Sequence, residues 1–129
     1  AGNAVSAAVC MTNIDILTEN NNDLIGRAGQ VGVETKEKLL EGAKASKFIG
    51  EVRGRGFMIG IELVKDKETR ERAGDEAEAV MYAALSKGLS FKTTMGNILT
   101  LTPALTITRE EMDKALDIIE VCIAEVENR

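Results

Sequence analysis

Two segments of this 129-residue chain carry residue types that could support chemistry on a phosphorylated or carbonyl compound. Gly54-Arg55-Gly56 places an arginine between two glycines, a pattern that can cradle phosphate when a helix begins directly after it. No helix is expected there, because the chain continues as an extended segment. We therefore interpret these glycines as structural, at a bulge or at a close approach of two backbones.

Lys92 is a second candidate, since it precedes a Gly-Asn turn and could be read as a Schiff-base lysine. Such a lysine must be desolvated and must lie beside a phosphate-binding cup, which no segment of the sequence predicts. We expect Lys92 to reach solvent from a strand. Glu62 and the carboxylates of the charged loop 65–72 have no partner at a spacing suited to acid–base work, so we expect a solvated face there.

The composition excludes several classes of site. The chain has no histidine, which removes the usual general base and most zinc sites. Its formal net charge is -5 and aromatic residues make up 3%, so nucleic acid is not an expected partner. No apolar run approaches the roughly 20 residues needed to cross a bilayer, so no membrane partner is expected either. No signal peptide is visible, and we expect a cytoplasmic setting.

Cys10 and Cys122 both fall on apolar faces of expected helices. We expect two buried, reduced thiols. A disulfide or a reactive thiol is the alternative.

Apolar residues at helical spacing predict helices over about 4–18, 23–45 and 75–87, and a last helix that begins at a capping box of Thr108 and Glu111. The Asn20-Asn21-Asn22 run is expected to end the first helix, because asparagine tolerates turns. Three glycines spaced by three interrupt the second helix: Gly26, Gly29 and Gly32. We expect close packing of this first half against another element; a loose first half is the alternative.

Alternating apolar residues predict one extended segment over 48–64 and short strands over 89–93 and 98–102, with a hairpin turn at 95–97. This order predicts an α/β (α+β) fold, a small and mostly antiparallel sheet with helices packed on one face. We expect a single domain over 1–129, with a helical part over 1–45 and the sheet with its helices over 46–129.

Three segments in the same order resemble the C-terminal small domain of class III, pyridoxal-phosphate-dependent aminotransferases of fold type I. They are Gly2–Ala8, Val52–Leu63 and Gly88–Thr108. The family often has proline where Ala4 stands. The resemblance extends over nearly the whole chain.

The resemblance implies a fragment of an enzyme that transfers amino groups between an amine or amino acid and a keto acid. In the family, the Schiff-base lysine, the aspartate at the pyridine nitrogen and most phosphate contacts precede this segment. A phosphate-binding threonine from the neighbouring subunit would stand just before Ala1. The resemblance thus implies a missing large cofactor-binding domain, a homodimer, and pyridoxal phosphate in the parent enzyme with none bound to this chain.

The position of Thr100 departs from the family pattern. Many members have an arginine there that grips the substrate carboxylate with two parallel hydrogen bonds. Threonine is short and neutral, so Thr100 is the candidate substrate-binding residue of this segment. The parent enzyme is expected to take an amine, a lactam or amino-acid amide, or a substrate held by an arginine elsewhere. The alternative is an ordinary strand residue.

Two further functions stay open. Some relatives racemise amino acids, amides or lactams instead of transaminating them. A stand-alone α+β binding or assembly module with no enzymatic role is the alternative from a different class.

Overall fold

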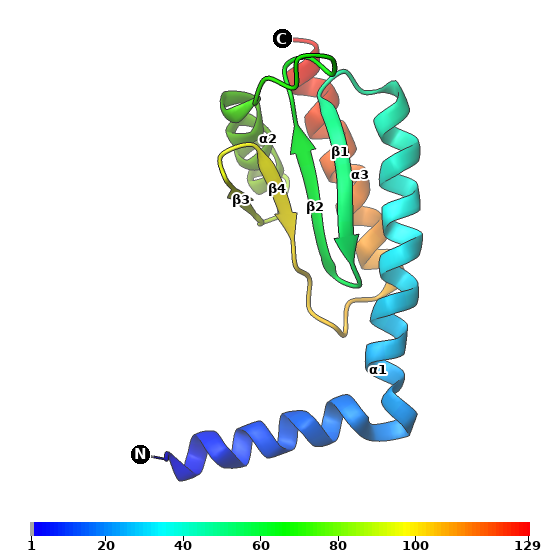
Figure 1. Ribbon diagram of the computed structural model, residues 1–129, viewed down its shortest axis with the longest axis vertical. Helices are drawn as coiled ribbons and strands as arrows, with labels where there is room; N and C mark the ends of the chain where they lie inside the picture. Colours follow the sequence, from blue (N-terminus) through cyan, green and yellow to red (C-terminus); the bar gives the residue numbers. More distant parts are fainter. Residues whose placement is uncertain (1) are drawn as a thin grey trace.

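A computed structural model of the protein describes residues 2–129 and shows a four-stranded sheet with helices on one face (Figure 1). Its elements are α1 (Ala4–Ala45), β1 (Ile49–Arg55), β2 (Met58–Leu63), α2 (Gly74–Ser86), β3 (Lys92–Thr94), β4 (Ile98–Leu101) and α3 (Arg109–Glu127). The strand order is β1-β2-β4-β3 and every neighbouring pair is antiparallel. The predicted fold class is confirmed. None of the helices within 2–129 combines the length and hydropathy that crossing a membrane requires.

α1 consists of two helices joined at the asparagine run. Asn3 caps its start, where the side-chain carbonyl oxygen accepts hydrogen bonds from the backbone N–H groups of Val5 and Ser6. Residues 19–22 leave the helical conformation, and the three asparagines have positive φ angles of 50°, 59° and 61°. Asparagine adopts this left-handed conformation more readily than other residues with a side chain. The predicted break is therefore confirmed.

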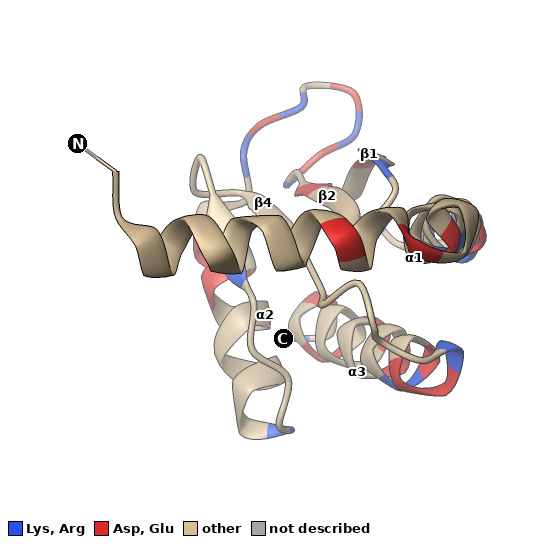
Figure 2. Cartoon of the chain, turned by 90° about the horizontal axis from the view of Figure 1, so that it is seen from below, with Lys and Arg blue, Asp and Glu red and all other residues tan. Residues whose placement is uncertain are grey.

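We call residues 4–18 the arm and residues 23–45 the stem. The stem packs beside the sheet, whereas the arm projects away from the rest of the chain (Figure 1). The arm carries one charged residue, Asp15 near its junction with the stem, and it is almost uniformly uncharged in Figure 2.

The extended segment predicted over 48–64 is two strands rather than one. β1 and β2 form a hairpin in which Arg55 pairs with Met58, so Gly56 and Phe57 make the turn. Gly56 has φ +56°, a conformation that glycine adopts without steric cost. At Gly54 a Cβ atom would lie 2.3 Å from the carbonyl oxygen of Met58. The structural reading of both glycines is confirmed, and the single strand was wrong because period-two alternation does not reveal a two-residue turn.

The stem approaches this turn at one glycine. A Cβ atom at Gly32 would lie 2.2 Å from the carbonyl oxygen of Gly56, so only glycine fits. Gly26 and Gly29 have nothing within 4 Å of that position. The expected close packing is therefore confirmed at Gly32 and wrong at the other two.

The core lies between the sheet and the helices. β2 alternates buried and less buried residues, and its buried members Ile59, Ile61 and Leu63 face the helix layer. Their partners from the other elements include Leu39, Val52, Val80, Leu99, Leu116 and Ile119. Burying each such side chain stabilises the fold by about 1.5–3 kcal/mol.

The β3–β4 hairpin is fastened to the end of β2 by Asn97. Met95 and Gly96 have positive φ angles and make the predicted turn. The buried Asn97 side-chain amide donates a hydrogen bond to the backbone carbonyl of Leu63 at 2.9 Å, and the backbone carbonyl of Asn97 accepts one from the Leu63 N–H at 2.8 Å. These two bonds fix how the hairpin lies against β2. β3 begins at Lys92, later than the predicted Leu89.

Candidate functional site

The face of the sheet that no helix covers is the surface on which the candidate residues gather, and we call it the open face. In an antiparallel sheet, paired residues point their side chains to the same side. Because Ile59, Ile61 and Leu99 point to the helices, their neighbours point away from them. Two rows of register partners therefore cross the open face: Arg53, Gly60, Thr100 and Lys92, and beside them Glu51, Glu62, Ile98 and Thr94.

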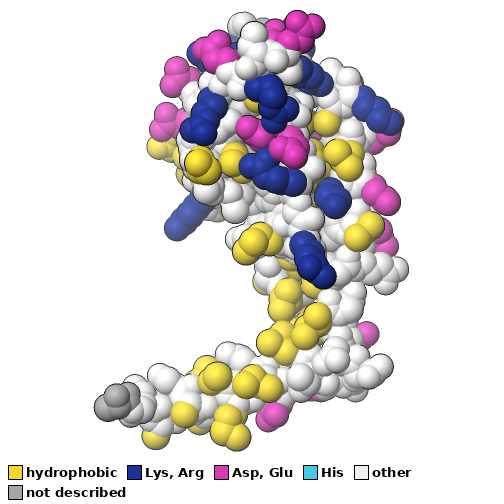
Figure 3. All heavy atoms as spheres, viewed as in Figure 1, with side chains coloured by type: hydrophobic (Ala, Val, Ile, Leu, Met, Phe, Trp, Pro, Cys, Tyr) yellow, Lys and Arg dark blue, Asp and Glu magenta, His cyan; other side chains and the backbone are white. Residues whose placement is uncertain are grey.

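A cluster of ion pairs occupies one side of the open face, where Figure 3 shows charged side chains of both signs together. Glu62 accepts hydrogen bonds from Arg53 and Arg70, each at 3.1 Å. Arg53 also bonds Glu51 at 2.7 Å. The Glu62 side chain is only 18% exposed. The hydrogen bond from Arg53, with the charge of Arg70, holds the pKa of Glu62 below its usual value.

This cluster corrects the expectation of a simply solvated Glu62. Its carboxylate is ionised and fully engaged by two arginines, so it is a structural ion-pair centre and is not poised to accept a proton. Sequence reasoning missed Arg53 and Arg70 as its partners. A hairpin reading of residues 48–64 would have placed Arg53 and Glu62 side by side.

Thr100 lies at the centre of its row, half-buried between Gly60 and Lys92. Its hydroxyl oxygen is 2.6 Å from that of Thr94. Gly60 has no side chain to cover it. The structure thus places Thr100 on an accessible part of the open face, beside a second hydroxyl and an ammonium group.

Lys92 is exposed, as expected, and lies on the strand at the edge of the sheet. Within residues 2–129 its ammonium group forms no ion pair. It has no enclosed phosphate-binding loop beside it, so the described part of the chain does not fit pyridoxal phosphate as a covalently held cofactor. No group of metal-ligating side chains occurs within the described residues either.

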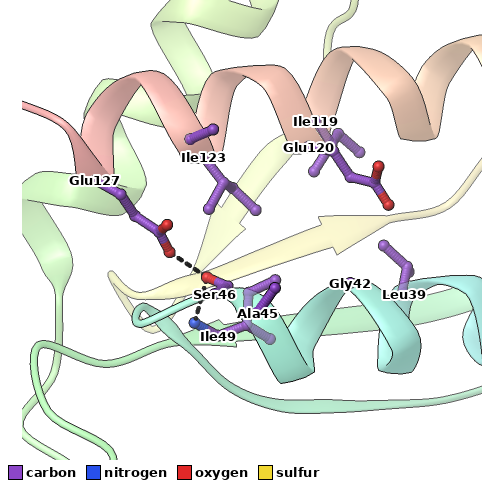
Figure 4. Close-up of a pocket in the computed structure, with 10 residues that line it drawn as sticks. Leu39, Gly42, Ala45, Ser46, Ile49, Ile119, Glu120, Ile123 and Glu127 are labelled. Atoms are coloured by element: carbon purple, nitrogen blue, oxygen red, sulfur yellow. Dashed lines mark hydrogen bonds between the residues drawn. The ribbon is translucent and has the colours of Figure 1, made fainter.

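A hollow of about 250 Å³ lies between the end of α1 and α3 (Figure 4). Glu127 reaches across it, accepting hydrogen bonds from the Ser46 hydroxyl and from the backbone N–H groups of Lys47 and Phe48 at 2.9 and 3.1 Å. Ser46 in turn accepts from the N–H of Ile49 at 3.3 Å. These bonds pair the backbone N–H groups of the connection between the stem and β1. We therefore interpret the polar groups around this hollow as structural.

A larger groove, of about 440 Å³, runs between the β3–β4 hairpin and α3. Its wall is mostly apolar, with Phe91, Leu101, Met112 and Leu116 among the lining residues. Thr100 and Lys92 also line it from the sheet. No carboxylate is among its lining residues, so its polar groups are hydroxyls and the ammonium group of Lys92.

The two cysteines differ in their surroundings. Cys122 is buried in α3, and burial raises the pKa of its thiol. Cys10 is exposed on the arm, so the expectation that both are buried was wrong for Cys10. Its apolar helix face exists, but no other part of residues 2–129 covers that face.

The sequence profile of class-III aminotransferases matches residues 1–123. The chain is 41% identical over 126 residues to a leucine/methionine racemase of Thermococcus litoralis, and 37% identical over 128 residues to an isoleucine 2-epimerase of Lentilactobacillus buchneri. These matches cover 98% and 99% of the chain, and 28% of each relative. A solved Bacillus anthracis aminotransferase superposes with a TM-score of 0.87 at 35% identity, covering 95% of this chain and 28% of that one.

The chain thus spans little more than a quarter of the relatives it matches. The matched residues include the stem, all four strands and most of α3. The chain belongs to the class-III aminotransferase family.

Proposed function

We propose that residues 1–129 form the C-terminal small domain of a pyridoxal-phosphate-dependent enzyme that transfers amino groups between an amine or amino acid and a keto acid. One observation carries this proposal: a family match over 1–123, in a chain whose described residues hold no enclosed lysine. The chemistry then belongs to the large domain, and this chain alone is inactive.

The arm supports the partners in this proposal. Its apolar side chains are exposed, with Val5 at 73%, Met11 at 67% and Ile14 at 53%. Apolar surface of this kind marks an interface. We propose that it packs on the missing large domain, within a homo-oligomer. The free state of Cys10 and Cys122 supports the proposed cytoplasmic setting.

In this reading the open face contributes to the substrate pocket, with Thr100 as its substrate-binding residue. A carboxylate beside a neutral threonine lacks the charge that offsets its desolvation. The position therefore favours substrates without a free carboxylate, or requires a cation elsewhere.

Racemisation is the second candidate, and the relatives favour it. The racemase and the epimerase named above are relatives that act on leucine, methionine and isoleucine. If the parent enzyme shares that chemistry, it inverts the Cα of an amino acid and releases no keto acid.

The test uses the full-length enzyme loaded with pyridoxal phosphate, and Thr100→Arg. Arginine could add about 1.5–3 kcal/mol through charge-assisted hydrogen bonds to a carboxylate. We expect kcat/KM to rise for an amino acid relative to its amide. An unchanged ratio in a folded, cofactor-loaded variant would show that Thr100 does not face the substrate.

Products of the same reactions separate the two activities. Keto acid formed in step with the loss of amino donor indicates transamination, whereas loss of optical activity without keto acid indicates racemisation. For the chain alone, incubation with pyridoxal phosphate and borohydride should give no single stoichiometric lysine adduct. Such an adduct accompanied by turnover would contradict the proposal that the chain is inactive.

A further inference from the structure

The ammonium group of Lys92 is a cation on the open face that no carboxylate of the described residues neutralises. Arg53 and Arg70 lie on the same side of the sheet, but both donate to Glu62. Lys92 has no such partner within residues 2–129. It is therefore available to an anion that comes from outside this chain.

The strand register brings Lys92 beside Thr100. The two residues are direct partners in the β3–β4 pairing, so their side chains leave the sheet on the same face with Cβ atoms about 4.5–5.5 Å apart. Lys92 extends beyond the short threonine. Any group that contacts the Thr100 hydroxyl is then within reach of the ammonium group.

The two threonine hydroxyls add a hydrogen-bond donor. At 2.6 Å, one of the Thr94 and Thr100 hydroxyls donates to the other. The hydroxyl that accepts keeps its own hydrogen free, because each carries a single O–H donor. A free O–H donor and an ammonium group side by side suit a carboxylate, which accepts at two oxygens.

Gly60 separates Thr100 from the ion pairs of the open face. It is the register partner of Thr100 on the other side and has no side chain. A Cβ atom there would lie 3.3 Å from Ile98 Cγ2, so Ile98 occupies the space directly over Gly60. Within this row, no charged side chain therefore stands between Thr100 and Arg53, and the charged neighbour of Thr100 is Lys92.

We propose that Lys92, with the Thr94–Thr100 hydroxyl pair, binds the carboxylate of a free amino-acid substrate. Lys92 is then a specificity-determining residue that supplies the charge Thr100 lacks. This inference rests on the proposed function, because it takes the open face to be part of the substrate pocket. It also reconciles a neutral Thr100 with relatives that act on leucine, methionine and isoleucine, all of which carry a carboxylate.

The test measures binding in the full-length, cofactor-loaded enzyme by calorimetry, so it does not depend on turnover. The probes are 4-methylpentanoate, which is leucine without its amino group, and the uncharged 4-methylpentanamide. Lys92→Met keeps most of the side-chain length and removes the charge. We expect the dissociation constant of the acid to rise at least about tenfold, while that of the amide stays the same.

Three further variants make the result specific. Lys92→Arg should keep most of the affinity for the acid, because it keeps the charge. Lys92→Met combined with Thr100→Arg should restore it, because the arginine replaces the lost cation one strand away. Lys114→Met, at an exposed lysine of α3 that forms no ion pair within 2–129, should change neither dissociation constant.

The inference is overturned if Lys92→Met binds the acid as tightly as wild type, if acid and amide weaken equally, or if the wild type does not bind the acid. Failure of the proposed function has a different signature. In that case the wild-type enzyme turns over no amino acid from a panel of leucine, methionine, isoleucine and alanine, whatever its affinity for 4-methylpentanoate.

Discussion

The arm and the stem both carry apolar residues at helical spacing, but only the stem buries part of them. In the stem, Val31 and Leu39 are 2% and 1% exposed, because the sheet and α3 cover them. In the arm, Val9 and Ile14 are 55% and 53% exposed. Helical spacing of apolar residues therefore predicts a helix and its apolar face. It does not predict which element, if any, packs against that face.

The largest expected effect on stability comes from a substitution at Gly32, where the stem packs against the β1–β2 turn. Gly32→Ala places a methyl group 2.2 Å from the Gly56 carbonyl oxygen, which must move and separate the stem from the β1–β2 turn. We expect a loss of about 2–3 kcal/mol in the free energy of unfolding, the upper range for overpacking. Urea unfolding followed by circular dichroism measures it.

The matched control is Gly29→Ala, one turn earlier in the same helix and with nothing within 4 Å. Alanine there should stabilise the stem by about 0.5–1 kcal/mol, because it removes the entropic cost of a helical glycine. Equal effects at the two positions would mean that the stem does not contact the turn as described.

A smaller effect is expected from substitutions in the exposed apolar face of the arm. We expect the isolated chain to self-associate through the arm, and the pair Val9→Gln with Ile14→Gln to weaken this association at least about tenfold, since each buried side chain contributes about 1.5–3 kcal/mol. Glutamine keeps helix propensity. Sedimentation velocity over a range of concentrations gives the association constant.

Asn13→Gln serves as the control, because it changes an exposed polar residue of the arm for another. The midpoint of thermal unfolding of the packed part should not change in any of these variants, because the arm lies apart from it. A wild-type chain that stays monomeric at high concentration would contradict the prediction.

The smallest expected effect concerns the open face and depends on pH. The folded-state pKa of Glu62 is lowered by Arg53 and Arg70, so its contribution to stability is present above the unfolded pKa of about 4.3 and is lost as pH falls through the lower, folded value. Glu62→Gln should therefore cost stability at pH 6 and little at pH 3. We expect less than about 1 kcal/mol, since the pair is partly solvated.

Urea unfolding at several pH values between 3 and 6 tests this difference, with Glu78→Gln as the control because Glu78 is exposed and forms no ion pair within 2–129. The difference between wild type and Glu62→Gln should shrink on acidification. If it is constant with pH, Glu62 does not titrate as an ion-pair partner.

Features set by neighbouring residues were predictable from the sequence. The Thr108 and Glu111 capping box forms as expected, and the asparagine run breaks α1 where it should. The turn at 95–97 is also present, and it fixes the register that brings Lys92 to Thr100. Local hydrogen bonding and backbone preference decide each of these, so a single sequence is sufficient.

Features set by distant contacts were not predictable. The β1–β2 turn depends on a left-handed Gly56, which alternation of apolar residues does not signal. The difference between Gly32 and Gly29 depends on which helix face meets the turn. The exposure of Cys10 depends on whether another element covers the arm, and none within residues 2–129 does.

The left-handed asparagines also set the direction in which the arm leaves the stem. The arm has the length of a 15-residue helix, about 22 Å, and a rotation of about 20° at the joint displaces its far end by about 8 Å. Such a rotation needs changes in only a few backbone torsions between residues 19 and 22, and it leaves every contact of the packed part in place. The torsions at three asparagines therefore set where the N-terminal end of the arm lies relative to the sheet.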